Sequence, residues 1–318
     1  MMLYAWSERM GTHMSKRKLG IGTWAYMFGP YAAHPIDFAT VCETIHRIGF
    51  DAVSISGFAP HIFVDEYDND AKVQELLALL KKNDLSVAEF SPDPCGLNPV
   101  LDPEPYIARM KKNILFLEKC GFPMLRLDTA CPPVLPEGVD YTLAFERTVH
   151  TFRQLAAFAA EHGVKVVWEF EPGFLFNKPS EICKVLASVD HPNFTVLFDA
   201  CHAYMCAVVG ARQMGERETL EGGVMEFLHM LQGHIGMVHL IDSDGTLHDN
   251  DTSTHTPFGA GHINMDEVYA ELCKPEIYDG EFISIDLCFW ADAWNVTQDC
   301  YDYVRALMSR HEDKEAAL

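Results

Sequence analysis

From Lys18 onward, the chain alternates short β-rich runs with longer segments whose apolar positions recur every three or four residues. The first pattern is typical of buried strands, and the second of helices that pack by one face. The predicted strands are Leu19–Tyr26, Ala52–Gly57, Ser86–Ser91, Met124–Thr129, Lys165–Glu171, Thr195–Asp199, Met237–Asp242 and Phe282–Leu287. The predicted helices are Ile36–Ile48, Ala71–Lys82, Pro105–Lys119, Tyr141–His162, Pro179–Val189, Glu218–Leu231, Met265–Leu272 and Gln298–Ser309.

This alternation favours an α/β protein with a single (β/α)8 TIM barrel. The alternative, an open doubly wound sheet, usually has fewer strands and a glycine-rich phosphate loop, and no such loop follows a predicted strand. Four segments also show a glycine between a helical pattern and a strand, where a left-handed residue can end the helix: "RIGFDAVSIS", "KCGFPMLRLD", "EHGVKVVWEF" and "IYDGEFISID". We expect the catalytic barrel to span residues 18–310, with an N-terminal tail over 1–17 and a C-terminal tail over 311–318.

The composition narrows the class of partner. Hydrophobic residues make up 48% of the chain, and its net charge is −22. Such a charge repels nucleic acid and anionic membranes, and the one basic run is Lys16–Lys18. No apolar run approaches the roughly 20 residues of a membrane-spanning helix, and the first residues carry no secretory signal. The ten scattered cysteines suit reduced thiols. These features predict a cytoplasmic protein.

Polar residues gather at the carboxyl ends of the last four predicted strands. They are Glu169 and Glu171, then Asp199, then His239 and Asp242, and finally Asp286. In a barrel these ends meet at one mouth. Carboxylates brought together without a cation repel each other and are costly to desolvate. Oxygen and imidazole donors without cysteine suit Mn²⁺, Mg²⁺, Co²⁺ or Zn²⁺ and disfavour a thiolate zinc site.

Five segments resemble the successive signature segments of the xylose-isomerase-like TIM barrels, a family of sugar phosphate isomerases and epimerases. They are "WEFEP", "LFDACH", "VHLID", "PFGAGHINMDEV" and "YDGEFISID", and the resemblance runs from about Lys18 to Met308. It implies one catalytic divalent metal ion, with manganese the first choice, bound by Glu169, Asp199, His239 and Asp286.

Two departures from the family pattern affect this ligand set. Asp286 stands where the family usually has glutamate. Glu169 and Glu171 lie two residues apart and share one face of their strand, so both are candidate ligands. We expect Glu169 to be the ligand. Glu171 is then a catalytic base or a residue that supports the site.

The neighbouring polar residues have weaker assignments. The resemblance gives His202, in the "DACH" segment, a catalytic or substrate-binding role, although a lone histidine is commonly a core residue. Arg126 is expected to bind a substrate oxygen or to form a salt bridge with a nearby acid. Asp242 is expected to orient an imidazole or to begin the following loop.

Three further residues are candidates for the wall of a sugar pocket, with simple packing as the alternative: Trp24, His61 and Trp290. The segment "SDGTLHDNDTSTHTPFGAGHI" is polar, rich in glycine and about 20 residues long. A loop of this length without secondary structure is usually a lid or a binding loop. Its histidines are irregularly spaced and do not predict a second metal ion.

A metal ion at a barrel mouth suits enolisation of a hydroxy-ketone with proton abstraction by a nearby base. We therefore expect a sugar isomerase or epimerase. The alternative is a lyase acting on a 3-keto-glycoside, because the catalytic subunits of C-glycoside deglycosidases are similar barrels. That reading implies a small β-rich second subunit, whereas the first allows a homo-oligomer. Two other hypotheses are weaker. The related DNA-repair endonucleases need a basic face, whereas this chain is strongly acidic. A barrel that had lost its metal and its catalytic activity would lack a ligand, and only the aspartate at Asp286 points that way.

Overall fold

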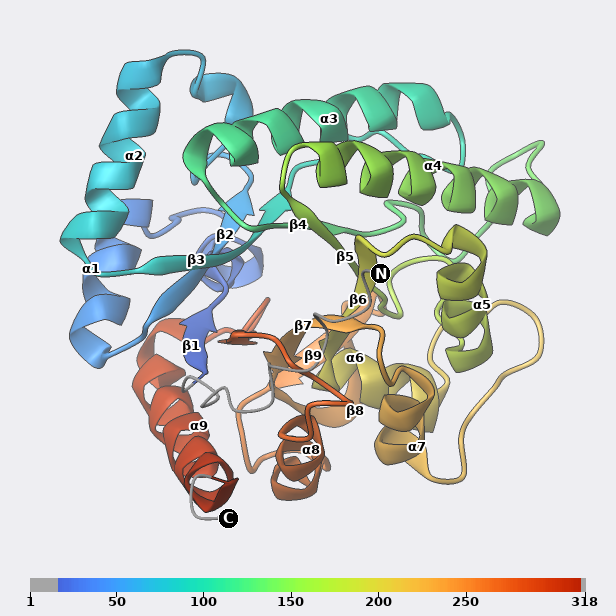
Figure 1. Cartoon of the computed structure of the whole chain (residues 1–318). Helices are drawn as coiled ribbons and strands as arrows, with labels where there is room; N and C mark the ends of the chain where they lie inside the picture. The colour runs from blue at the N-terminus through green and yellow to red at the C-terminus, as the bar shows by residue number, and fades with distance from the viewer. Residues whose placement is uncertain (1–16, 316–318) are drawn as a thin grey trace, which may run out of the picture.

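Eight parallel strands form the centre of the protein. The computed structural model describes residues 17–315. The strands are β1 (Lys18–Ile21), β2 (Ala52–Gly57), β3 (Ser86–Pro92), β4 (Met124–Leu127), β5 (Lys165–Glu169), β6 (Phe194–Asp199), β7 (Ile235–Leu240) and β10 (Phe282–Ile285). Their order is β1-β10-β7-β6-β5-β4-β3-β2, and a bridge between Gly22 and Ser54 joins the two ends (Figure 1). The predicted (β/α)8 barrel is confirmed.

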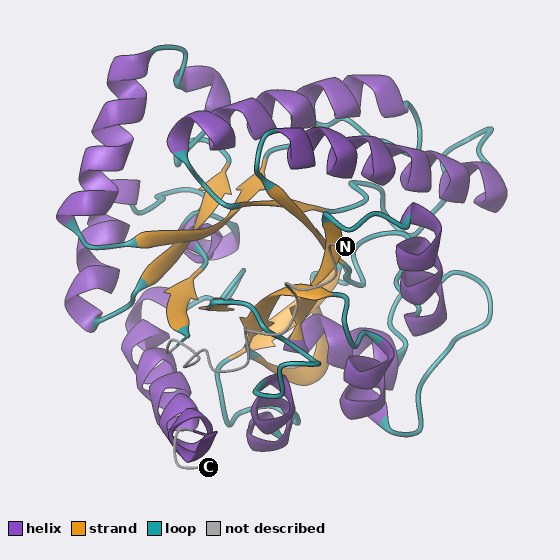
Figure 2. Cartoon of the chain, viewed as in Figure 1, coloured by secondary structure: helices purple, strands orange, loops and turns teal. Residues whose placement is uncertain are grey.

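The helices surround this barrel (Figure 2). They are α1 (Phe38–Ile48), α2 (Asp70–Lys82), α3 (Pro103–Cys120), α4 (Tyr141–Glu161), α5 (Pro179–Val189), α6 (Ala200–Tyr204), α7 (Gly223–Met230), α8 (Met265–Leu272) and α9 (Ala293–Glu315). Their ends follow the expected local chemistry. The Asp37 side chain accepts a hydrogen bond from Thr40 N at the start of α1. Gly49 and Gly121 end α1 and α3 in the left-handed conformation.

Three sequence-based expectations need correction. The segment after β7 has its own structure, because β8 (Asp242–His248) and β9 (Thr252–Thr256) pair as an antiparallel hairpin. The expected C-terminal tail is wrong for residues 311–315, which continue helix α9. The first predicted strand is shorter, since β1 ends at Ile21 and a 3-10 helix covers Thr23–Tyr26. Residues 1–16 of the expected N-terminal tail lie outside the described residues.

The barrel interior is built in layers. One layer is a small apolar cluster of Ala52, Ala88, Met124, Val167, Leu197 and Met237. Because side chains alternate along a strand, the residue two positions later also faces inward, nearer the carboxyl end. For β4, β5, β6 and β7 those residues are Arg126, Glu169, Asp199 and His239. The apolar layer therefore supports the polar layer on which the candidate site is built.

Within residues 17–315, no helix combines the length and the apolar character that crossing a bilayer requires.

Candidate metal centre

Three carboxylates and one imidazole converge above the apolar layer. The ligand atoms of Glu169, Asp199, His239 and Asp286 all lie within 4.8 Å of one another. Adjacent strands bring them together: Asp199 on β6 is in register with His239 on β7, and β10 pairs with β7 on the other side. All four side chains are buried. The structure thus brings together the four predicted metal ligands.

His239 lies at the centre of this group. Its Nδ1 is 3.1 Å from Glu169 Oε1, 3.5 Å from Asp286 Oδ2 and 3.9 Å from Asp199 Oδ2. Among the described residues, Nδ1, Glu169 Oε1 and Asp199 Oδ2 are buried without a hydrogen-bond partner. Buried polar atoms are normally paired. Unpaired atoms that face one point from three neighbouring strands are what a bound cation would satisfy.

The electrostatics of the acids point the same way. Burial raises the pKa of Asp199 to about 7, and the charges of Asp286 and Glu169 add to the rise although His255 opposes it. Burial alone would also raise the pKa of Glu169, but the Arg126 guanidinium and His239 lower it to about 2. One acid of the cluster therefore tends to hold a proton while its neighbour is ionised. A divalent ion would let all of them ionise together.

The other nitrogen of His239 reveals a residue that the sequence analysis missed. His239 Nε2 pairs with Oε1 of Glu89, a fully buried side chain on β3. Desolvation would lower the pKa of His239, but the Glu89 charge and the carboxylates around it raise it well above the usual value. Trp24 Nε1 donates to Asp286 Oδ1 at 2.9 Å, so it holds a predicted ligand as well as lining the site.

Arg126 and Glu171 stand beside this cluster. Arg126 forms a buried ion pair with Glu169 and donates to Ser91 Oγ at 3.2 Å, and its Nε has no partner among the described residues. Burial and the Glu169 charge raise the pKa of Glu171 to about 8. Glu171 is not part of the four-residue cluster. It is held by Thr252 Oγ1, which donates to its Oε2.

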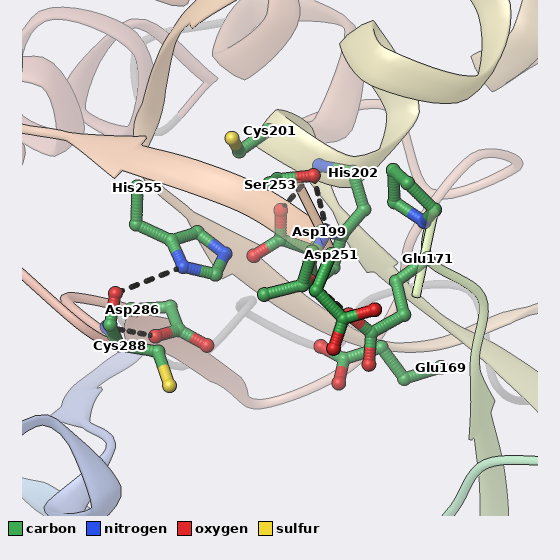
Figure 3. Close-up of polar contacts among 12 residues, drawn as sticks. Glu169, Glu171, Asp199, Cys201, His202, Asp251, Ser253, His255, Asp286 and Cys288 are labelled. Carbon is green, nitrogen blue, oxygen red and sulfur yellow. Dashed lines mark hydrogen bonds and ion pairs between the residues drawn. The ribbon is translucent and has the colours of Figure 1, made fainter. Parts of the chain in front are cut away.

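The β8–β9 hairpin forms one wall of the site and carries its other missed residues. Ser253 Oγ bonds His202 Nδ1 at 2.8 Å, and burial lowers the pKa of His202 to about 3, so this imidazole is neutral. His255 Nδ1 bonds the Cys288 carbonyl at 3.3 Å. Figure 3 shows His255 and Glu171 on opposite sides of Asp199. Antiparallel pairing with β8 places β9 beside the cavity. Both strands are polar and show no clear alternation, so the sequence did not predict this hairpin.

Atoms of Asp199, His202 and His255 also lie within 4.8 Å of one another. This second group shares Asp199 with the first. The irregular spacing of histidines in the sequence did not predict that one of them would reach the barrel mouth, because the hairpin folds back over the strand ends.

A cavity of about 190 Å³ opens above the cluster. Its polar lining includes Arg126, Asp128, Glu169, Glu171, His202, Asp251, Thr252, His255 and Asp286. Its apolar lining includes Trp24 and four phenylalanines, Phe28, Phe58, Phe174 and Phe289. The cavity is smaller than the ~300–1,000 Å³ typical of drug-sized ligands. It is polar at its base and aromatic at its side walls, which suits one ring-sized polar group.

Three of the candidate residues, His61, Asp242 and Trp290, do not line this cavity, which favours the alternative stated for each of them over a role in the site. His61 Nε2 bonds the Ile36 carbonyl at 2.9 Å, and its ring packs against Phe38. The Asp242 carboxylate accepts hydrogen bonds from the backbone of Gly259, Gly261 and Ile263 instead of from an imidazole. This arrangement anchors the segment after β9.

Trp290 is the third of these residues. It is partly buried against the hydrophobic core, and its backbone N donates to the Leu287 carbonyl at 3.1 Å. The turn after β10 points Phe289, not Trp290, into the cavity lining. Phe289 has a φ of 63°, a conformation that bulky residues seldom adopt. Its neighbour Trp290 therefore contributes to packing.

The sequence profile of the xylose isomerase-like TIM barrel family matches residues 42–300. The chain belongs to that family. A comparison of the sequence with curated proteins gave no match.

Solved structures give the same fold. A D-psicose 3-epimerase from Clostridium cellulolyticum, in complex with D-tagatose, is 17% identical with a TM-score of 0.69, over 92% of this chain and 99% of that one. A probable 3-DHS dehydratase from Bacillus anthracis is 18% identical with a TM-score of 0.68, over 91% and 98%. The IOLI protein with a bound zinc atom is 17% identical with a TM-score of 0.68, over 92% and 99%. At such identities the likeness concerns the fold.

Proposed function

We propose that this protein is a divalent-metal-dependent carbohydrate enzyme that enolises a hydroxy-ketone sugar, acting as an epimerase or isomerase. The observation that carries the proposal is the convergence of Glu169, Asp199, His239 and Asp286, with buried atoms that have no partner among the described residues. These four residues would hold the ion, with manganese first among manganese, magnesium, cobalt and zinc. The bound ion supplies a positive charge that polarises the substrate carbonyl.

Glu171 is the proposed base. It lines the cavity beside the cluster, and Thr252 fixes its carboxylate. When it removes the proton next to the carbonyl, the C–H bond breaks and its electron pair forms the carbon–carbon double bond, so that the carbonyl oxygen takes the negative charge. Return of a proton to the opposite face of the same carbon gives an epimer, and transfer to the other carbon gives an isomer.

Arg126 and His202 are the proposed substrate-binding residues. Both line the cavity, and the Arg126 Nε has no partner among the described residues. A guanidinium donates several hydrogen bonds in fixed directions, which suits adjacent hydroxyl oxygens and a developing oxyanion. The neutral His202, held through Nδ1 by Ser253, presents its Nε2 edge 4.0 Å from Glu171 Oε2. A sugar hydroxyl bound there would lie next to the proposed base.

The aromatic wall favours a second candidate, a lyase acting on a 3-keto-glycoside. The partly exposed rings of Phe28, Phe58, Phe174 and Phe289 line the same cavity as the acids. Phe28 packs edge-on against Phe58 at 5.1 Å and stacks near Phe289 at 6.2 Å. Such a surface gains binding energy from an apolar group attached to the sugar. In that reaction the same enolisation is followed by departure of the group on the next carbon.

A metal-binding series tests the site. We expect the purified protein to bind one divalent ion per chain, and Glu169→Gln, Asp199→Asn and His239→Gln each to weaken binding by at least ~100-fold, because a ligand is lost and not only its outer support. Calorimetric titration with Mn²⁺ measures this. Asp244→Asn is the matched control, since this hairpin acid bonds Thr246 and lies outside the cluster. A wild type without metal affinity, or variants that bind equally well, would refute the site.

The reaction is tested by hydrogen exchange in D₂O. The substrates are D-fructose, D-psicose and D-tagatose on one side and 3-keto-glycosides with aryl groups on the other. Incorporation of deuterium next to the carbonyl of a free ketose supports the epimerase or isomerase. Release of the aryl group supports the lyase. No exchange and no release with either class would contradict enolisation.

The two candidate functions imply different assemblies. The epimerase or isomerase is expected as a homo-oligomer, and the lyase in a complex with a small β-rich second subunit. The mass of the natively purified complex distinguishes these assemblies. We place the activity in the cytoplasm, since all ten cysteines are in the reduced thiol form.

A further inference from the structure

Glu89 has no place in the proposed reaction. It is fully buried on β3 and does not line the cavity, so it cannot touch a substrate held there. One of its oxygens pairs with His239 Nε2. The other, Oε2, has no hydrogen-bond partner among the described residues. A carboxylate buried in this way is costly, which calls for a role beyond filling space.

A β-bulge brings Glu89 to this position. Val53 on β2 pairs with Val87, but the next residue, Ser54, pairs with Glu89, so Ala88 is an extra residue on β3. Ala88 lies in the apolar layer inside the barrel. Without the bulge, strict alternation from Ala88 would turn Glu89 outward.

The rest of β3 follows the shifted phase. Phe90 contacts Phe116 of α3, outside the barrel, at a centroid distance of 5.8 Å, whereas Ser91 lines the cavity within it. Bulges often re-aim a side chain next to an active site. Here the bulge aims a carboxylate at the imidazole of a proposed metal ligand.

We infer that Glu89 is a positioning residue for the proposed metal site: it accepts a hydrogen bond from His239 Nε2–H and thereby directs the Nδ1 lone pair to the ion. This inference rests on the proposed metal site. An imidazole has one N–H when neutral, and the group bonded to one nitrogen decides which nitrogen is free to bind a metal. His239 Nδ1 is the atom that faces the carboxylates, at 3.1 Å from Glu169 Oε1.

The ring of His239 is also held from the side. Trp24 lies at a centroid distance of 5.5 Å with an interplanar angle of 41°, and it bonds Asp286 at the same time. Trp24 limits the tilt of the ring, and Glu89 fixes its rotation and its protonated nitrogen. A ring flip, which would move each nitrogen to the place of a ring carbon, is thereby opposed.

Metal affinity tests the inference without any substrate. The variants are Glu89→Leu, which removes the acceptor, and Glu89→Gln, which keeps an acceptor oxygen. Ser54→Ala is the matched control, because Ser54 is equally buried inside the barrel and bonds Ser284 at 2.7 Å. We expect Mn²⁺ affinity to fall about 10- to 100-fold in Glu89→Leu, as is typical when the partner of a ligating histidine is lost. Glu89→Gln is expected to lose less, and Ser54→Ala to match the wild type.

Each result decides the matter. Affinity in Glu89→Leu within about threefold of the wild type, or an equal loss in Ser54→Ala, overturns the inference. If Glu89→Leu does not fold by circular dichroism, Glu89→Met, which also removes the acceptor but keeps the length of the side chain, decides instead, and unchanged affinity there overturns the inference. If the wild type binds no ion, the proposed function and this inference both fall. If the wild type binds the ion but exchanges no sugar hydrogen, only the proposed reaction falls.

A spectroscopic readout separates positioning from loss of structure. In the zinc-loaded protein with ¹⁵N-labelled histidine, we expect His239, assigned with His239→Gln, to carry its proton on Nε2. The resonance of that proton should be protected from solvent exchange in the wild type. In Glu89→Leu it should lose this protection. A proton on Nδ1 in the zinc-loaded wild type contradicts the inference.

Discussion

The acid floor and the hairpin wall of the site are built in different ways. The floor consists of Glu169, Asp199, His239 and Asp286, which come from or directly follow four neighbouring strands of the closed barrel. The wall comes from a single two-stranded hairpin, β8–β9. The hydrogen-bond register of the barrel fixes the positions of the floor residues. The wall is fixed by its own pairing and by hydrogen bonds to Glu171, His202 and the Cys288 carbonyl.

The two regions also differ in what they contact. Floor residues face one another around a shared point, so they are suited to hold charge. The wall residues Thr252 and Ser253 each bond one group at the edge of the cavity, Glu171 and His202 respectively. On the proposed function, we expect the floor to govern metal affinity and the wall to govern turnover. The largest expected effect of any change is therefore the loss of Mn²⁺ affinity when a metal-ligand candidate of the floor is replaced, as in the series above.

The next largest effect is expected at Glu171, where floor and wall meet. Glu171→Gln removes the proposed base but leaves the four-residue cluster intact. We expect kcat to fall about 10²- to 10⁴-fold, the usual contribution of a general base, while Mn²⁺ affinity stays within a few-fold of the wild type. Turnover and calorimetric titration measure the two quantities. Loss of metal affinity equal to that of Glu169→Gln would instead make Glu171 a ligand.

The pH dependence sharpens the same assignment. A base must be unprotonated, and burial together with the Glu169 charge raises the pKa of Glu171 to about 8. We therefore expect kcat/KM to rise with pH, up to tenfold per pH unit below that pKa, and then to level off. A cation on Glu169 offsets the charge that helps to raise this pKa, so the metal-loaded enzyme should level off below pH 8.

A profile of kcat/KM against pH from about 5 to 9 checks this expectation. Glu171→Gln should lack the rising limb in its residual activity. A limb that persists unchanged in that variant would assign the titration to another group.

The smallest effects are expected in the wall. Thr252→Val removes the donor to Glu171 and Ser253→Ala the partner of His202. We expect each to lower kcat/KM by about 5- to 20-fold, in keeping with about 1–2 kcal/mol for one lost hydrogen bond, with metal affinity unchanged. Because the Thr252 bond favours the ionised carboxylate, its loss should also shift the rising pH limb upward.

The control on the same hairpin is Thr254→Val, since Thr254 Oγ1 bonds Thr246 on the exposed side. It should leave kcat/KM and the pH limb unaltered. If Thr254→Val has the same effect as Thr252→Val, the wall acts through general hairpin stability and not through its contacts to Glu171.

Much of this architecture was predictable because it repeats along the chain. Alternating strand and helix patterns predicted the barrel, and the family resemblance implied the four floor residues, which the barrel then brings together. Those predictions depend on local periodicity and on the rule that parallel strand ends meet. The hairpin was not predictable in this way, because its strands are polar on both sides and lack a clear alternation. His255 therefore went unassigned, and the hydrogen bonds of Asp242 to the segment after β9 were not predicted.

The sequence by itself determined the order of elements and placed the acids and His239 at the ends of strands, since each of these is a property of neighbouring residues. Only the tertiary structure decided which side chains face inward where the alternation is interrupted. The Ala88 bulge reverses the phase of β3, and no composition of a single strand reveals which pairing partner will impose such a shift. The pairing of β3 with β2 thus turns Glu89, an acid in the middle of an apolar strand, toward His239.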